Sequence, residues 1–249
     1  MAGCGNARGA RRHVLIVTKA CHYSGDEDRV RKDALDADIA TSMTALGVDS
    51  IDLLLLHRDD PTVPVGEVVD WLAEHQARGH IAAYGGSNWA PERVDAANAY
   101  ATRKSLAPFA AVSNNLSLAV AREPMWRGCV YADATTRAWH STTQMPNLAW
   151  SSQAHGFFGG RFRPGQIDDA NVRRVYDSPT NWERLGRATE LAERLGVTPI
   201  QIACAYVLCQ PFPSFALIGP ANGAELQESL AAADIRLTTE QRRWLEGTT

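Results

Sequence analysis

The sequence contains little that would support disulfide or metal chemistry. It has only five cysteines, an odd number. They are scattered singly, without the paired spacing that zinc sites or disulfide frameworks require. They are Cys4, Cys21, Cys129, Cys204 and Cys209. We therefore expect reduced thiols, as in a cytoplasmic protein, and no metal site.

Excess basic charge and long apolar runs are also lacking. The net charge is -3, which argues against nucleic acid or an anionic membrane as a partner. No apolar stretch of signal-peptide length precedes Val14, and no run approaches the length of a transmembrane helix. These absences favour a soluble protein.

The composition is that of an ordinary globular chain. Of 249 residues, 45% are hydrophobic and 21% are charged, and this length suits one α/β barrel or two small domains. No low-complexity tract or linker divides the chain. We expect one domain over residues 1–249, with an irregular Gly- and Arg-rich start at 1–12.

The most informative stretch is the apolar run at 51–56, which contains four consecutive leucines. An apolar run without alternation predicts a strand buried on both faces, and Asp59, Asp60 and Pro61 end it. His57 follows directly. A histidine after a strand can simply bond a neighbouring carbonyl, but this position is also where parallel sheets keep their chemistry.

Strand and helix patterns alternate along the chain. Strands are predicted at 14–18, 51–56, 81–84, 109–112, 148–151 and 215–218. Helices are predicted at 33–46, from Pro64 to Gly79, and at 91–102, 182–195, 199–210, 225–233 and 238–245. We interpret residues 85–88 as a tight turn, 152–177 as an irregular segment, and Trp126 and Trp139 as flanking a further helix. About six strand-helix units indicate a parallel sheet with right-handed crossovers.

Several candidate site residues fall at or just beyond the carboxyl ends of the predicted strands. They are Lys19, His57, Ser87, Asn88, Ser113, Trp150, Ile218 and Gly219. In a barrel of parallel strands, all of these positions lie on one face, where the loops carry catalysis.

Several short motifs then appear in a fixed order. They are Val17-Thr18-Lys19, Leu46-Gly47-Val48-Asp49-Ser50-Ile51-Asp52-Leu53 leading to His57, Gly79-His80-Ile81 leading to Gly86-Ser87-Asn88-Trp89, Ala149-Trp150-Ser151-Ser152, Gly156-Phe157-Phe158-Gly159-Gly160, Leu217-Ile218-Gly219-Pro220 and Leu226-Gln227-Glu228-Ser229-Leu230. In this combination, from about residue 12 to the end, the chain resembles the aldo-keto reductase family. The segment from His57 to Pro61 suggests a bacterial branch.

The resemblance implies a (β/α)8 TIM barrel that reduces aldehydes or ketones with NADP(H) or NAD(H) and without a metal. In such enzymes a tyrosine donates a proton to the carbonyl oxygen. Lys19 matches the lysine that lowers the pKa of this tyrosine. His57 matches the histidine that donates a hydrogen bond to the same oxygen.

The resemblance also implies the cofactor contacts. Ser87 and Asn88 match the pair that holds the carboxamide, Trp150 matches the ring that stacks on the nicotinamide, and Gly219 begins the segment around the adenosine phosphates. The other matching positions are Ser113, Ser151, Ile218, Gln227, Glu228 and Ser229. Ala221 stands where a basic residue often meets the 2′-phosphate, so the choice between NADP and NAD is open. Arg161 and Arg163 could supply that charge, or could simply be solvated.

The family's aspartate and tyrosine have no match. They belong to the second strand and its loop, and this chain begins before what should be the third strand. At roughly thirty residues for each unit, about the first two β/α units, or some sixty residues, are absent. Tyr23 could replace the acid, although a loop tyrosine is usually a surface residue.

Two hypotheses follow from this departure. In the first, the protein starts upstream and is an active reductase. In the second, a truncated and inactive relative binds a nucleotide or a partner chain. Its strands at 14–18 and 215–218 would then be open barrel edges, through which copies could associate.

Overall fold

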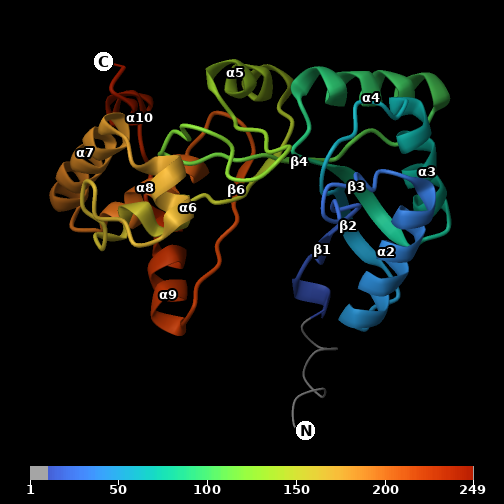
Figure 1. The fold of residues 1–249 in the computed structure, drawn as a ribbon, viewed down its shortest axis with the longest axis horizontal. Helices are drawn as coiled ribbons and strands as arrows, with labels where there is room; N and C mark the ends of the chain where they lie inside the picture. The colour runs from blue at the N-terminus through green and yellow to red at the C-terminus, as the bar shows by residue number, and fades with distance from the viewer. Residues whose placement is uncertain (1–10, 249) are drawn as a thin grey trace, which may run out of the picture. The chain divides into compact units, whose positions relative to one another are not determined.

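A computed structural model describes residues 11–248 (Figure 1). The chain divides into two compact units, and the boundary falls between Val112 and Ser113. Each unit is described by itself. That the chain is a single domain stays a prediction.

The first unit alternates strands and helices, as the sequence predicts. Its elements are η1 (Arg11–His13), β1 (Val17–Ala20), α2 (Lys32–Leu46), β2 (Ile51–Leu56), α3 (Val65–Ala77), β3 (Ile81–Ser87) and α4 (Pro91–Lys104). β2 pairs in parallel with β1 on one side and with β3 on the other. The parallel sheet expected from the strand-helix order is therefore confirmed in this unit.

The apolar run that forms β2 is buried as expected. Ile51, Leu54, Leu55 and Leu56 are at most 1% exposed. A strand between two others, with helices packed on its sheet, has no solvated face, and this explains why its sequence does not alternate. α2 ends at Gly47, which adopts φ 64° in the left-handed region that favours glycine at a helix end.

The turn predicted at 85–88 is wrong, because β3 continues to Ser87. The two glycines serve close packing instead of a turn. A Cβ at Gly85 would lie 2.0 Å from the carbonyl oxygen of Ala111, and one at Gly86 would lie 2.5 Å from the Trp89 ring. Only Asn88, at φ 60°, leaves the strand conformation.

The second unit has the same alternation. Its elements are β4 (Val112–Ser113, at the boundary), α5 (Ala134–Thr143), β5 (Asn147–Ala149), η2 (Ala154–Gly159), α6 (Ala170–Tyr176), α7 (Pro179–Leu195), α8 (Pro199–Leu208), β6 (Ser214–Ala216), α9 (Gly223–Ala231), η3 (Ala232–Asp234) and α10 (Thr239–Glu246). β5 and β6 are parallel. Residues 11–248 thus hold six strands that alternate with helices, an α/β order consistent with a (β/α)8 barrel.

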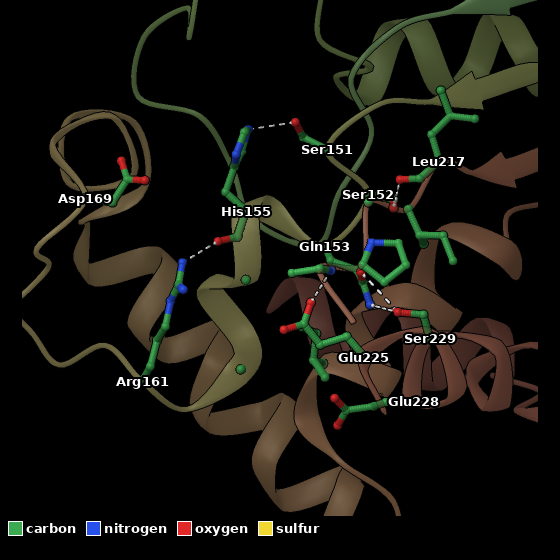
Figure 2. A pocket seen from close by; sticks show the side chains of 17 residues that line it. Ser151, Ser152, Gln153, His155, Arg161, Asp169, Leu217, Glu225, Glu228 and Ser229 are labelled. Atoms are coloured by element: carbon green, nitrogen blue, oxygen red, sulfur yellow. Dashed lines mark hydrogen bonds between the residues drawn. The ribbon is translucent and has the colours of Figure 1, made fainter. Parts of the chain in front are cut away.

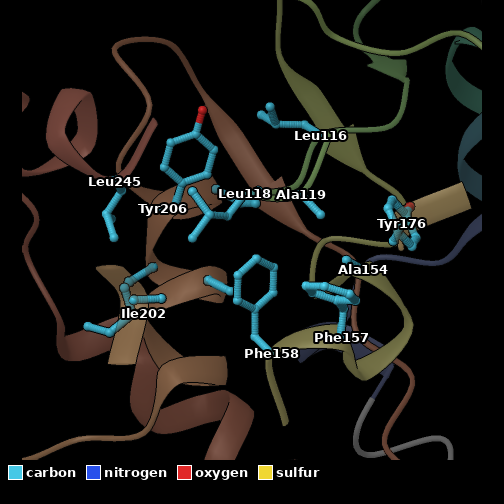
Figure 3. Close-up of a cluster of buried hydrophobic side chains, with 14 of the residues drawn as sticks. Leu116, Leu118, Ala119, Ala154, Phe157, Phe158, Tyr176, Ile202, Tyr206 and Leu245 are labelled. Carbon is cyan, nitrogen blue, oxygen red and sulfur yellow. The ribbon is translucent and has the colours of Figure 1, made fainter. Parts of the chain in front are cut away.

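One apolar cluster forms the core of the second unit (Figure 3). Phe157 and Phe158 of η2 pack edge to face, with ring centroids 5.5 Å apart, and both are fully buried. Ile202 and Tyr206 of α8 belong to the same cluster. The segment that follows β5 is therefore anchored by its own aromatic side chains.

Two sequence predictions in this unit need correction. α5 begins at Ala134 and contains Trp139, because the carboxylate of Asp133 accepts the backbone N–H of Thr136 and caps the helix there. The segment 152–177 is not irregular throughout, since it contains η2 and α6. In the first unit, the start of β1 differs as well, because residues 14 to 16 lie outside the strand and Leu15 is 80% exposed.

No helix within residues 11–248 is both long enough and apolar enough to cross a membrane.

The packing of β3 gives a test with a matched control. Gly85→Ala should destabilise the protein by about 3 kcal/mol, since backbone must move to admit the methyl group. Gly186→Ala, in the middle of α7 with nothing within 4 Å of the added Cβ, should instead stabilise it by about 0.5–1 kcal/mol. Urea unfolding of both variants measures the difference. Equal effects of the two substitutions would contradict the close approach at Gly85.

Candidate active site

The first unit brings Lys19 and His57 to one face of its sheet. Lys19 aligns with Leu55 in the register of β1 and β2. His57 lies two residues beyond Leu55 and therefore points to the same side. Its backbone N–H donates to the carbonyl oxygen of Ala20 at 2.7 Å, which extends the ladder past the end of β2. Both side chains thus lie at neighbouring carboxyl strand ends, as predicted.

The His57 imidazole is neutral at ordinary pH. Burial, and after it the repulsion of a further positive charge by Lys19, His22 and Arg58, together lower its pKa to about 3. The His22 ring meets the His57 ring edge to face, with centroids 4.3 Å apart. A neutral imidazole still carries one N–H, so His57 can donate a hydrogen bond.

The Lys19 side chain is mostly buried and carries no ion pair or hydrogen bond within residues 11–248. Burial lowers its pKa, and the charge of Arg58 lowers it again. The guanidinium of Arg58 also lies 5.5 Å from the centroid of the Tyr23 ring. The surroundings of Lys19 therefore include a second cation, Arg58. No carboxylate within residues 11–248 pairs with Lys19, although a buried lysine usually has such a partner.

Asn88 joins this group. Its amide nitrogen donates to the carbonyl oxygen of His57 and lies within hydrogen-bond distance of the Ser87 hydroxyl, each at 3.2 Å. Both side chains are at most 5% exposed. The left-handed backbone at Asn88 turns the amide back toward His57, so the end of β3 is fixed to the end of β2.

The second unit contains a pocket of about 640 Å³ built from the segments that follow β5 and β6 (Figure 2). Its lining residues are Ser151, Ser152, Gln153, His155, Gly156, Gly159, Arg161, Asp169, Ile200, Leu217, Ile218, Gly219, Pro220, Ala221, Glu225, Glu228 and Ser229. Five predicted cofactor residues are among them, namely Ser151, Ile218, Gly219, Glu228 and Ser229. Gln227 is exposed and does not line the pocket.

Side-chain hydrogen bonds fix the pocket wall. The hydroxyl of Ser152 donates to the carbonyl oxygen of Leu217 at 2.7 Å, and the amide of Gln153 donates to the hydroxyl of Ser229 at 3.2 Å. Figure 2 shows both bonds crossing between the two segments. The pocket is therefore held open by the fold itself.

The first segment is bent sharply around His155. Ser151, Ala154 and His155 have φ of 50°, 49° and 53°, a conformation that side chains other than glycine rarely adopt and that concentrates at functional sites. The Ser151 hydroxyl lies 2.9 Å from Nε2 of His155, and Arg161 donates to the His155 carbonyl. Burial lowers the pKa of His155, which leaves Arg161 as the cation of the pocket lining.

Two predicted residues lie elsewhere in this unit. The hydroxyl of Ser113 donates to the carbonyl oxygen of Leu148 at 2.7 Å and so bonds to β5. Trp150 packs against Tyr131, with ring centroids 5.6 Å apart. Its indole Nε1 is buried and has no hydrogen-bond partner in the described chain. A buried donor without a partner is costly, so this one is a candidate to face a ligand.

Sequence reasoning missed Gln153, Asp169 and Glu225. They lie in or next to segments without periodicity, and no motif marks them. Only Glu225 had a signal, since Asn222 three residues earlier is a helix-capping residue whose side chain accepts the Glu225 N–H.

Known proteins resemble the chain over nearly its full length. The model of the Aldo/keto reductase family matches residues 2–247. A putative voltage-gated potassium channel subunit beta of Schizosaccharomyces pombe is 24% identical over 219 residues, which cover 80% of this chain and 59% of that protein. Oxidoreductase YdhF of Escherichia coli is 27% identical over 96% of this chain and 67% of its own length. Aldo-keto reductase str7 of Strobilurus tenacellus is 26% identical, with coverages of 94% and 68%. The chain thus spans about three fifths to two thirds of these relatives.

The environment of His57 predicts its titration. In the unfolded chain its pKa is about 6.5, whereas in the folded protein it is about 3. Between these values the unfolded state binds a proton that the folded state does not, so stability falls as the pH drops below about 6.5. Imidazole ¹⁵N shifts should report a neutral His57 from pH 8 to about pH 4.5. A midpoint near 6.5, absent in His57→Gln, would contradict this burial.

Proposed function

The chain belongs to the aldo-keto reductase family, and from this premise we propose that it acts in the NAD(P)H-dependent reduction of aldehyde or ketone carbonyls to alcohols. Two of the relatives described above, which are named as an oxidoreductase and as an aldo-keto reductase, support the reaction class. The substrate is a small carbonyl compound. That the whole protein is an active carbonyl reductase belongs to the same proposal.

The pocket of the second unit is the observation that carries this proposal. Gly219 lines it, and a Cβ there would project into open space, so the wall leaves room for a nucleotide backbone. The hydroxyl of Ser151, the second amide N–H of Gln153 and the guanidinium of Arg161 are donors suited to phosphate and ribose oxygens. A bound nicotinamide nucleotide supplies the hydride. The donor set fits its adenosine and phosphate part.

The proposed roles in the first unit concern the substrate carbonyl. Neutral His57 would donate its N–H to the carbonyl oxygen, where negative charge builds during reduction. Ser87 and Asn88 would hold the carboxamide, and Asn88 is already fixed on His57. Trp150 of the second unit would offer its ring to the nicotinamide. These roles rest on the family match of each residue.

The charges near Ala221 favour NADH over NADPH. The backbone N–H of Ala221 donates to the carboxylate of Glu225 at 2.8 Å. If the adenosine 2′-position lies near Ala221, as the resemblance implies, a 2′-phosphate would face this carboxylate, whereas a 2′-hydroxyl could donate to it. Glu228 adds a second carboxylate to the lining.

A second candidate is a protein that binds the nucleotide without turnover. The specific observation behind it is Lys19, which has no acidic partner within residues 11–248. A reductase without its proton donor would be slower by on the order of 100- to 10,000-fold.

Nucleotide titration followed by a rate assay tests both candidates. Tryptophan fluorescence should show NADH binding about tenfold tighter than NADPH, a preference worth roughly 1.4 kcal/mol. NADH absorbance should then fall in the presence of a reactive aromatic aldehyde, and His57→Gln should slow this about 100-fold. Binding without any turnover would support the second candidate. Failure to bind either nucleotide would overturn both.

Substitutions at Ala221 provide the matched control for the nucleotide preference. Ala221→Arg should reverse it toward NADPH, because it places a cation beside the 2′-phosphate. Ala221→Gln has a similar length without charge and should leave NADH favoured. Equal responses to the two substitutions would contradict the assigned position of the adenosine.

A further inference from the structure

The segment after β1 is held in a strained shape beside the candidate active site. Cys21 adopts φ 60°, in the left-handed region that residues other than glycine rarely enter. Its backbone N–H donates to the carboxylate of Asp38 in α2 at 2.8 Å. Arg29 forms an ion pair with the same carboxylate at 2.8 Å and donates to the carbonyl oxygen of His22 at 3.1 Å. The backbone is therefore fixed on both sides of the His22 side chain.

The ring of His22 is fixed as well. Its Nδ1 lies 2.8 Å from the carbonyl oxygen of Tyr23. Because a carbonyl oxygen only accepts, Nδ1 carries the proton of this hydrogen bond. The Tyr23 ring also lies against the His22 ring, with centroids 4.2 Å apart. The His22 side chain therefore has little freedom to turn.

Contacts between side chains join this segment to the one after β2. The rings of His22 and His57 meet at an angle of 70°, with centroids 4.3 Å apart. Arg58 donates to the carbonyl oxygen of His57 at 2.8 Å, and its guanidinium lies 5.5 Å from the centroid of the Tyr23 ring. Lys19, His22 and Arg58 are the charged or titratable groups that act on His57. The His57 imidazole thus packs against a ring that other contacts already hold in place.

We propose that His22 is a positioning residue, whose ring confines the His57 imidazole to the orientation in which it donates to a substrate carbonyl. Contacts between aromatic rings are directional, and a hydrogen-bond donor assists a reaction best when it is oriented before charge develops. Both histidines keep part of their surface open to solvent, so the contact leaves His57 accessible to a small molecule. The benefit for catalysis rests on the function proposed above, whereas the confinement of the ring does not.

Two substitutions separate the ring of His22 from its hydrogen bond. His22→Phe keeps a ring against His57 but cannot donate to the carbonyl oxygen of Tyr23. His22→Asn keeps an N–H donor close to the position of Nδ1 but has no ring. If the ring confines His57, only His22→Asn should release the imidazole.

Imidazole ¹H–¹⁵N correlation spectra of the full chain give the first readout, which needs no turnover. His57→Gln assigns the His57 signals. In the unaltered protein and in His22→Phe, we expect a single neutral tautomer of His57 from pH 8 to about pH 4.5. In the unaltered protein, nuclear Overhauser effects should connect the ring protons of His22 and His57. In His22→Asn, water reaches the imidazole, so the pKa of His57 should rise and its signals should titrate within this range, because burial is the main cause of the low pKa.

The rate at which NADH reduces a reactive aromatic aldehyde gives the second readout. In His22→Asn, kcat should fall about tenfold while the KM for NADH stays unchanged, and His22→Phe should restore most of this loss. If the spectra change as expected but none of the proteins turns over, the reductase proposal is overturned and the confinement of His57 is confirmed.

Three results would overturn the proposal itself. The first is equal release of His57 by both substitutions, since the bond to Tyr23 and not the ring would then hold the site. The second is a His57 titration in His22→Asn that matches that of the unaltered protein. The third is the absence of nuclear Overhauser effects between the two rings in the unaltered protein, which decides the question even if a variant fails to fold.

Discussion

The parallel register between β1 and β2 is the constraint on which the candidate active site of the first unit depends. It places Lys19 and His57 at neighbouring strand ends, on one face, and removes both from most of their water. The sheet can hold polar groups there because β2, apart from Asp52, is apolar and pairs with a strand on each side. Burial then determines the chemistry, since both pKa values fall and neither group has a carboxylate in the described chain to oppose this.

In the second unit, the main structural requirement is a fixed wall around a polar pocket. Aromatic side chains of η2 anchor the segment after β5 in the core, and hydrogen bonds from Ser152 and Gln153 join it to the segment after β6 and to α9. The strained backbone at 151–155 is tolerated because both ends of it are fixed in this way. The pocket lining contains Arg161 as a cation but also three carboxylates, and this charge pattern is the basis of the proposed preference for NADH.

The sequence was sufficient to predict an element or the family where one physical signal dominated. The leucine run predicted β2, Gly47 predicted the end of α2, and the ordered motifs predicted the family. The sequence misled where contacts with other segments decide the conformation. Gly85 and Gly86 predicted a turn, but they belong to β3, where they allow the close approach of Ala111 and Trp89. α5 begins at a capping aspartate that was overlooked. Gln153 and Asp169 could not be found, because only the folded loops bring these residues to the pocket wall.

The central claim is that the pocket of the second unit binds the adenosine diphosphate part of a nicotinamide nucleotide. The most direct measurement is the change in backbone amide NMR shifts of the full chain on titration with ADP-ribose, which has this part but no nicotinamide. The account predicts shifts concentrated at residues 151–161 and 217–229. Saturating ADP-ribose that leaves both segments unchanged, or that shifts only residues outside them, would contradict it.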